Sequence, residues 1–415
     1  MSLTPRITGS GGRLFADPAP SPDETSFQVD NTSDAYYSSP YYEKHQNDLQ
    51  PFPVPRVAPP RMDLSDVLGS AILDPITSGS RITFHAVGDT GAARHTDPVS
   101  LALSDEAGVA DAMTADVSQT PATADTPAFF FHLGDVVYEF GEDQYYYDQF
   151  YEPFRLYDRP IFAIPGNHDG VVYGESATTP AVPTLTAFLR NFCATTPGHA
   201  ADAGAVVRST MDQPGVYFTL DAPHVSIIGL YSNVLEGPGV ISTQGGKYPT
   251  INDDQLTFLT GELTRLKPES EAGTRAVLVA VHHPPASADA AHGGTTGLAD
   301  DIDSCAQNAG IWPDVVLSGH AHLYQRFTRV TPDKTRQIPY IVAGAGGYNA
   351  TKPQGEVGVG TTLGDYTLAA GPIVHFGYLT ITVDVSAHTL TAVYHLSGGG
   401  IGDTVTVDLA AHAVS

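Results

Sequence analysis

Five short segments of the chain place polar residues immediately after runs of hydrophobic residues. They read GDTG at 88–91, GDVVY at 134–138, GNHD at 166–169, VAVHHPP at 279–285 and GHAH at 319–322. A buried strand that breaks at a glycine presents the next residues at its carboxyl end, which is the edge where open α/β sheets bind ligands. We therefore expect these five segments to converge on one site.

The donor groups in these segments are carboxylates, a phenol, a side-chain amide and imidazoles. They suit iron, manganese or zinc. A thiolate site is excluded because the chain has only Cys193 and Cys305, whose pairing the sequence leaves open. The candidates exceed the needs of one metal ion and fit two ions that share a bridging carboxylate, an arrangement suited to phosphoester hydrolysis. The seven candidate ligands are Asp89, Asp135, Tyr138, Asn167, His282, His320 and His322.

The order of the five segments resembles that of the calcineurin-like metallophosphoesterases, and within them the purple acid phosphatases. Many relatives in the wider superfamily carry Asp-x-His in the first block. Here the third position is Gly91, and a tyrosine, Tyr138, lies three residues after Asp135. This exchange marks the purple acid phosphatase branch. The resemblance covers roughly 78–410 loosely and is specific only in the five blocks.

The resemblance implies a role for each candidate. Asp89, Asp135, Tyr138 and His322 would hold a ferric ion, while Asp135, Asn167, His282 and His320 would hold Zn²⁺, Mn²⁺ or Fe²⁺, with Asp135 bridging. A phenolate is a hard anionic donor that suits Fe³⁺. In the family His168 contacts phosphate, and a histidine after the fourth block, here His292, assists the leaving group. Asp169 is expected to orient His168 by a hydrogen bond.

Three of these assignments have competing interpretations. Tyr138 could be a core aromatic residue, but with Gly91 in place of histidine the first metal needs another ligand. His283 competes with His282, and the family pattern, in which one residue separates the ligand from a proline, selects His282. His292 could instead be an exposed loop histidine.

The resemblance also implies the architecture, a four-layer α/β/β/α sandwich with the di-metal centre at strand ends along one edge. We assign this catalytic domain to residues 78–415. Helices are expected from Ser104 to about Gln119, over 142–157, and from a cap at Asn252. Residues 1–77 are rich in proline, and PFPVPRVAPP at 51–60 can form neither a long helix nor a central strand. We expect this acidic segment to be an extended arm draped over the domain, or to be partly disordered.

The charge of the chain restricts its partners. With 20 Lys and Arg against 46 Asp and Glu, the formal net charge is −26, which argues against binding to nucleic acid. Two cations would leave the pocket locally positive, so a small phosphorylated substrate is expected. No apolar run is long enough to span a membrane. No secretory signal is evident, which makes the location cytoplasmic by default, or secreted or periplasmic if a signal was removed. The oligomeric state is open.

These observations predict a metal-dependent phosphoester hydrolase, in which a hydroxide held by the metals attacks phosphorus. The expected activity is that of an acid phosphatase on phosphomonoesters. One alternative is a phosphodiesterase acting on cyclic nucleotides or glycerophosphodiesters. Another is a catalytically silent metal- or phosphate-binding protein. Silent relatives are expected to lose a ligand, whereas this chain keeps all seven.

Overall fold

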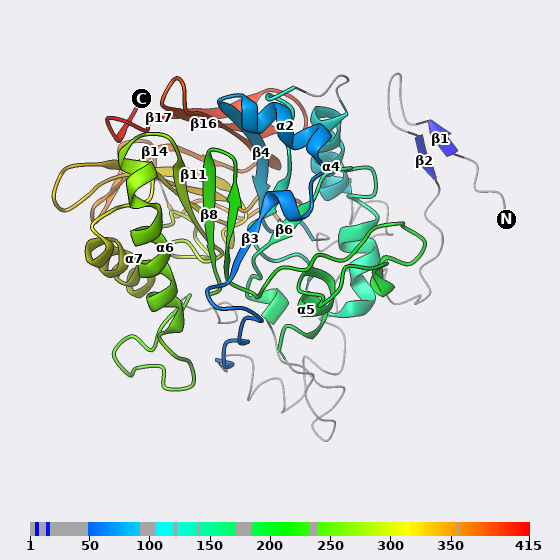
Figure 1. Ribbon diagram of the computed structural model, residues 1–415, viewed down its shortest axis with the longest axis horizontal. Coiled ribbons are helices and arrows are strands. Elements are labelled where there is room, and N and C mark those ends of the chain that lie inside the picture. Colours follow the sequence, from blue (N-terminus) through cyan, green and yellow to red (C-terminus); the bar gives the residue numbers. More distant parts are fainter. Residues whose placement is uncertain are drawn as a thin grey trace.

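The computed structural model describes residues 5–7, 14–16, 49–91, 104–118, 123–138, 141–170, 184–232, 239–355 and 357–415. Two large β-sheets face each other, and helices lie outside them (Figure 1). The expected α/β sandwich is therefore confirmed. Most of the expected arm lies outside the described residues. Its described beginning is a two-stranded antiparallel ribbon of β1 (Pro5–Ile7) and β2 (Leu14–Ala16).

The first sheet has seven strands in the order β18-β17-β16-β15-β4-β5-β6. Its parallel part contains β4 (Arg81–Val87), β5 (Phe130–His132) and β6 (Ile161–Ala163). Its antiparallel part contains β15 (Gly377–Asp384), β16 (Thr389–Leu396), β17 (Ile401–Asp408) and β18 (Ala413–Val414). Because β4, β5 and β6 are parallel, their carboxyl ends lie at the same edge.

The second sheet has nine strands in the order β13-β14-β11-β12-β10-β9-β8-β7-β3. Four neighbouring strands run parallel: β8 (Val225–Leu230), β9 (Ala276–Val281), β10 (Val315–Ser318) and β12 (Gln337–Ala343). The others are β3 (Arg61–Asp63), β7 (Phe218–Ala222), β11 (Tyr324–Val330), β13 (Thr362–Leu363) and β14 (Tyr366–Ile373). The parallel block again collects several strand ends at one edge.

The continuous hydrophobic run of β9 shows why the sheets are covered on both faces. Leu278 and Ala280 belong to the apolar cluster between the sheets, whereas Val277, Val279 and Val281 belong to the cluster under the helices. A strand buried on both faces needs apolar residues at every position. In β15, by contrast, Leu379, Ile381 and Val383 are buried while the intervening threonines are half-buried, so one of its faces is more open to solvent.

The helices lie outside the sheets. α6 (Asp254–Glu271) and α7 (Thr296–Ala309) pack together, and α6 lies against β8 and β9. On the other sheet α4 (Ser104–Val117) contacts β15. The shorter helices are α2 (Ser70–Ser78) and α5 (Thr186–Phe192), with 3-10 turns η3 (Leu64–Asp66), η6 (His168–Gly170) and η7 (Ala201–Ala203). No helix within the described ranges is long and apolar enough to cross a membrane.

Two of the expected helices differ in detail. Residues 142–157 form a 3-10 turn, η4 (Asp143–Tyr145), and a π-helix, η5 (Tyr147–Tyr151), in place of one regular helix. Their aromatic side chains are buried on several sides, among them Tyr146, Phe150 and Tyr151, and tertiary packing overrides the regular period. The N-cap residue of α6 is Asp253 and not the expected Asn252, although the side chain of Asn252 accepts a hydrogen bond from the Asp254 amide.

Residues 49–78 lie against the sandwich. β3 pairs in parallel with β7 at the edge of the nine-stranded sheet, and Arg61 in β3 forms an ion pair with Glu262 in α6.

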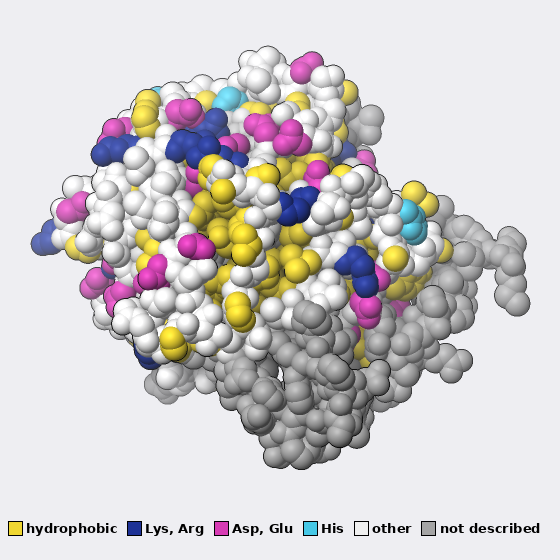
Figure 2. Space-filling view, turned by 60° about the horizontal axis from the view of Figure 1, so that its bottom comes forward, with side chains coloured by type: hydrophobic (Ala, Val, Ile, Leu, Met, Phe, Trp, Pro, Cys, Tyr) yellow, Lys and Arg dark blue, Asp and Glu magenta, His cyan; other side chains and the backbone are white. Residues whose placement is uncertain are grey.

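A groove of about 510 Å³ runs between residues 54–61 and α6 and includes Tyr217 and Phe258. Figure 2 shows hydrophobic side chains gathered near the middle of the face that is turned forward. Both cysteines are buried and free.

Candidate metal centre

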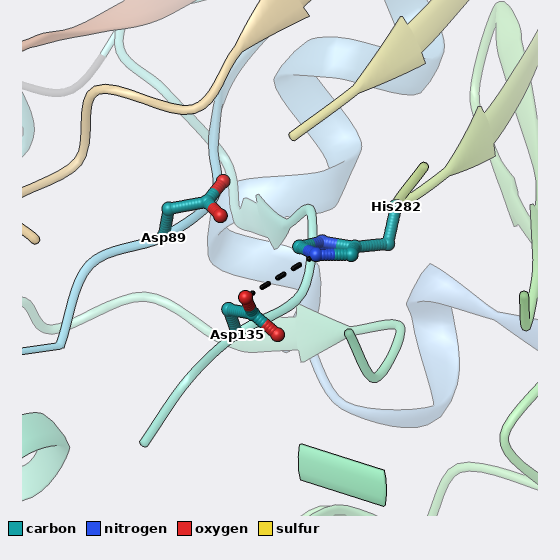
Figure 3. A group of neighbouring side chains, drawn as sticks. All are labelled: Asp89, Asp135 and His282. Carbon is teal, nitrogen blue, oxygen red and sulfur yellow. Dashed lines mark ion pairs between the residues drawn. The ribbon is translucent and has the colours of Figure 1, made fainter. Parts of the chain in front are cut away.

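The structure brings together all seven candidate ligands where the edges of the two sheets meet. β4, β5 and β6 end shortly before Asp89, Asp135 and Asn167, while β9 and β10 end shortly before His282 and His320. All seven residues are buried, with exposed fractions between 0% and 5%. Figure 3 shows Asp89, Asp135 and His282 pointing toward one another, and their donor atoms all lie within 4.8 Å of each other.

One part of the cluster, which we call the tyrosine half, contains Asp89, Tyr138 and His322. The Tyr138 hydroxyl lies 3.2 Å from Asp89 Oδ1 and 3.3 Å from His322 Nε2. It also donates a hydrogen bond to Asp135 Oδ2 at 3.0 Å. His322 Nδ1 donates to the carbonyl oxygen of Asn349 at 3.0 Å, which leaves its Nε2 lone pair directed at the tyrosine oxygen.

The other part, the asparagine half, contains Asn167, His282 and His320. Asn167 Oδ1 lies 2.9 Å from both His282 Nε2 and His320 Nδ1. His282 Nε2 is also 3.3 Å from Asp135 Oδ2. The same oxygen of Asp135 therefore faces both halves.

The donor spacing fits bound cations. Donors that bind one cation at about 2.1 Å and at right angles to each other lie about 3 Å apart, as they do here. His282 Nδ1 donates to the Leu133 carbonyl at 2.8 Å, so the neutral ring presents a lone pair at Nε2. That lone pair faces the acceptor oxygen Oδ1 of Asn167, and two acceptors at 2.9 Å need a proton or a cation between them. The donor types and geometry therefore suit a pair of metal ions.

Gly91 makes room for Tyr138. A Cβ atom at position 91 would lie 2.5 Å from Tyr138 Cδ2 and 2.8 Å from Gln149 Oε1. Gln149 in turn accepts a hydrogen bond from the Tyr138 amide and donates one to its carbonyl, so the tyrosine backbone cannot shift easily. A side chain at position 91 and the Tyr138 ring exclude each other. The exchange seen in the sequence thus has a steric cause.

Three candidate ligands adopt a left-handed backbone. The φ angles are 58° at Asp89, 55° at Asp135 and 68° at His320. Non-glycine residues in this region cost about 1–3 kcal/mol each, and such strain clusters at functional sites. Hydrogen bonds of the Asp89 amide to the Gly134 carbonyl and of the His320 amide to the Asp89 carboxylate hold these turns.

Burial controls the protonation of the centre. It raises the pKa of Tyr138 well above its ordinary value, with the Asp135 and Asp89 carboxylates adding to the effect. It lowers the pKa of His322 to about 3 and that of His320 well below its ordinary value. Burial alone would also lower the pKa of His282, but the Asp135 carboxylate raises it to about 9. In the metal-free protein a proton on His282 thus takes the position of a cation.

His168 and Asp169 lie beside the Asp135 carboxylate. The His168 amide donates to Asp135 Oδ1 at 2.9 Å, and its ring is 4.5 Å from that of Tyr138. Asp169 accepts hydrogen bonds from the amides of Val136 and Gly166, so it fixes the second and third polar segments to each other. Burial, followed by the Asp135 charge, raises the pKa of Asp169 to about 7.

The adjacent residues His282 and His283 have different surroundings. His283 Nδ1 lies 2.6 Å from the hydroxyl of Ser232, and its ring is 4.2 Å from that of His320. One ring nitrogen of His283 is therefore paired with Ser232, which is not one of the candidate ligands. Of the two, His282 has its Nε2 among the converging donors.

His292 approaches the cluster from the loop between β9 and α7. Its ring centre is 4.6 Å from that of His320 and 4.9 Å from that of His322. The side chain is 16% exposed. The loop histidine is therefore partly buried beside two candidate ligands, and it has one open side.

Tyr348 and Gln149 also shape the centre, and the sequence did not indicate either. The Tyr348 ring stacks on Tyr138 at 3.5 Å with 4° between the planes, and its amide donates to the Asp89 carbonyl. A usable signal existed for Tyr348, because VAGAGGYNA after β12 repeats the pattern of a strand followed by glycine and a polar residue. No signal pointed to Gln149, which reaches Tyr138 from the π-helix η5.

The fold and the cluster together define a class of protein. The calcineurin-like phosphoesterase model matches residues 82–324, which include all five polar segments, and the chain belongs to this family. The family uses a centre of two metal ions, and in this chain the buried Asp89, Asp135 and His282 form a group that could hold a metal ion. No curated protein matches the chain in sequence.

Three solved structures are similar in fold. The purple acid phosphatase PPD1 from yellow lupin (Lupinus luteus) seeds has 14% identity and a TM-score of 0.50, over 80% of this chain and 54% of that one. This chain thus spans about half the length of the lupin protein. GAP50, the anchor in the inner membrane complex of Plasmodium, has 12% identity over 78% and 88% of the two chains, with a TM-score of 0.49. A dimetal phosphatase from Danio rerio has 12% identity over 79% and 99%, with a TM-score of 0.43.

Proposed function

We propose that this chain is a purple acid phosphatase-like phosphomonoesterase with a centre of two unlike metal ions. The observation that carries the proposal is the single oxygen, Asp135 Oδ2, that lies within 3.3 Å of both the Tyr138 hydroxyl and His282 Nε2. A carboxylate oxygen between two donor sets suits a bridge between two cations. The presence of a tyrosine in only one set makes the two positions chemically unlike.

We assign the ligands by half. The tyrosine half and Asp135 would hold Fe³⁺, because two carboxylates and a phenolate offer hard anionic oxygens. The asparagine half and Asp135 would hold Zn²⁺, Mn²⁺ or Fe²⁺, because two imidazoles and an amide are neutral donors. When bound, the cations would neutralise the charge of a phosphate group and lower the pKa of water. The low pKa values of His320 and His322 keep their lone pairs available in acid.

The remaining residues of the centre would bind and orient the substrate. His168 lies against Tyr138 and is anchored to the bridge by its amide, so its imidazole is placed to contact phosphate. His292 stands over His320 and His322, where it would contact the oxygen of the leaving group. Asp169 keeps the turns at 134–138 and 166–169 in register. The expected substrate is a small phosphomonoester.

Metal analysis, a visible spectrum and turnover of two substrates test this proposal. The purified protein should contain iron and a second metal, and a tyrosinate-to-iron absorption band should disappear in Tyr138→Phe. Nitrophenyl phosphate should be hydrolysed faster than bis(nitrophenyl) phosphate. A strong preference for the diester would make the chain a phosphodiesterase, and no turnover with both metals bound would make it a binding protein. An iron-loaded protein without the band would refute ligation by Tyr138.

A further inference from the structure

Asp289, in the loop between β9 and α7, makes a direct contact with His292. Its side chain is buried, and its Oδ2 lies 2.9 Å from His292 Nδ1. The same oxygen accepts a hydrogen bond from the His292 amide at 3.3 Å. Two contacts from one carboxylate oxygen fix both the backbone and the ring of His292.

The ring held in this way has a defined direction. Its Nδ1 edge faces Asp289, and its centre lies 4.6 Å and 4.9 Å from the centres of His320 and His322. The opposite nitrogen, Nε2, has no hydrogen-bond partner among the described residues. The hydrogen bond at Nδ1 restricts rotation of the imidazole about the Cβ–Cγ bond. Nε2 therefore has a fixed orientation relative to the candidate ligands.

The loop is also attached to its surroundings by hydrogen bonds that do not involve the Asp289 side chain. The Ala288 amide donates to Gln325 Oε1 at 2.8 Å, and the Ala288 carbonyl accepts from the Gln354 amide at 2.7 Å. The Ala290 amide donates to the Lys352 carbonyl at 2.9 Å. These bonds attach the backbone on both sides of Asp289 to neighbouring segments. The Asp289 carboxylate accepts one further backbone hydrogen bond, from the Ala291 amide to Oδ1 at 3.4 Å, while its Oδ2 contacts the His292 ring.

We propose that Asp289 is a positioning residue, which holds the imidazole of His292 over His320 and His322 so that Nε2 faces the leaving group of the substrate. The inference rests on the proposed phosphoesterase function, because a leaving group has meaning only in that reaction. Asp289 itself does not contact the substrate. Its effect passes entirely through His292.

A double-mutant cycle tests whether the effect passes through His292. The metal-loaded full chain is compared with Asp289→Ala, His292→Ala and the double variant, using dinitrophenyl, nitrophenyl and phenyl phosphate. With phenyl phosphate, Asp289→Ala should lower kcat about 10- to 100-fold with little change in KM, because a misplaced group loses about that factor. The loss in kcat should be smaller for substrates with more acidic leaving groups. The kcat of the double variant should equal that of His292→Ala. Additive losses, or full activity in either single variant, would overturn the proposal.

Two further measurements exclude a structural effect. Asp301→Asn is the matched control, because Asp301 is a partly buried carboxylate that accepts a hydrogen bond from Ser242 nearby, and its kcat should not change. Metal content should be equal in all variants. Nitrogen NMR of histidine-labelled, zinc-loaded protein should show the Nδ1 hydrogen bond of His292 and its loss in Asp289→Ala; an unchanged signal would overturn the proposal. A wild-type protein that keeps this signal but hydrolyses no phosphoester would contradict the proposed function and not the contact.

Discussion

The two halves of the candidate centre lie on either side of one carboxylate but differ in charge. The tyrosine half supplies the Asp89 carboxylate and a phenol with one imidazole, whereas the asparagine half supplies two imidazoles and an amide. Both halves are equally buried, so the difference comes from donor type and not from access to water. Two sites of similar spacing can thus prefer ions of different charge, because only one offers anionic oxygens in addition to the shared Asp135.

The tyrosine half requires a cation to ionise its donors, more than the asparagine half does. Burial and the two carboxylates keep Tyr138 protonated, with its pKa well above the ordinary value. Burial likewise raises the pKa of Asp89 well above its ordinary value. Ionising both groups at neutral pH requires a strong positive charge among them. The asparagine half does not need a cation to ionise its donors. Two imidazoles and an amide are neutral ligands once His282 has lost its proton.

Removing the shared carboxylate should have the largest effect. Asp135→Asn should release both metals, and kcat/KM should fall about 10⁴-fold or more, because the cations carry most of the catalysis at such a site. Metal analysis and phosphatase assays check this result. Asp125→Asn, at an exposed carboxylate that pairs with Arg81, should keep both. Loss of only one metal would mean that Asp135 is not a bridge.

Filling the space beside Tyr138 should damage the tyrosine half alone. Gly91→Ala places a Cβ atom 2.5 Å from Cδ2 of the tyrosine ring, so the ring must shift from its position beside Asp89. We expect loss of the visible band and of one metal, about a 10³-fold loss of activity, and a cost of about 1–3 kcal/mol in stability from overpacking. Gly261→Ala, in α6 with no atom near the added carbon, is the matched control. A Gly91→Ala protein that retains the band would contradict the steric account.

Changing a residue outside both halves should leave the metals in place. His168→Ala should retain two metals and the visible band but lose about 10²-fold in kcat, because the imidazole acts on the substrate. His395→Ala, where the ring stacks on Tyr378 in the seven-stranded sheet, should lose nothing. Full activity of His168→Ala would remove its assigned contact with phosphate.

The smallest effect concerns the metal-free asparagine half. The pKa of His282 is raised from 6.5 to about 9 by Asp135 against the effect of burial. A raised histidine pKa stabilises the fold below pH 6.5, and this stability is lost as the pH rises through 9. Urea unfolding of the metal-free protein should therefore show a loss of about 3 kcal/mol between pH 6.5 and 9.5. His282→Gln should flatten this dependence. A flat wild-type profile would contradict the charged pair.

The sequence predicted the convergence of the five polar segments from local patterns, whereas the sandwich was predicted from the resemblance to a known family. A hydrophobic run that ends at Gly-Asp or Gly-His places its polar residue at a strand end, whatever the rest of the chain does. The same strand-end pattern at VAGAGGYNA could have pointed to Tyr348, but the stacking of Tyr348 on Tyr138 and the hydrogen bonds of Gln149 could not be predicted in this way. Each depends on how the end of β12 or the π-helix η5 lies over Tyr138, and such packing is set by the tertiary structure.

The local prediction also failed to resolve helix type and loop contacts. The aromatic run at 142–157 has the composition of a helix, but its buried tyrosines impose 3-10 and π turns. Asp289 lies only three residues from His292, yet nothing in the loop sequence shows that the two side chains turn toward each other. Nearby residues on irregular backbone meet only when the fold bends them together.

The steric exclusion between position 91 and Tyr138 has an evolutionary consequence. A chain that kept the tyrosine while acquiring a histidine at position 91 would have two side chains in the same space, and a chain that lost the tyrosine first would lack one of the proposed ligands. Neither single step preserves a complete centre. The two forms of the first metal position are therefore separated by a fitness valley, and selection opposes their interconversion by single substitutions.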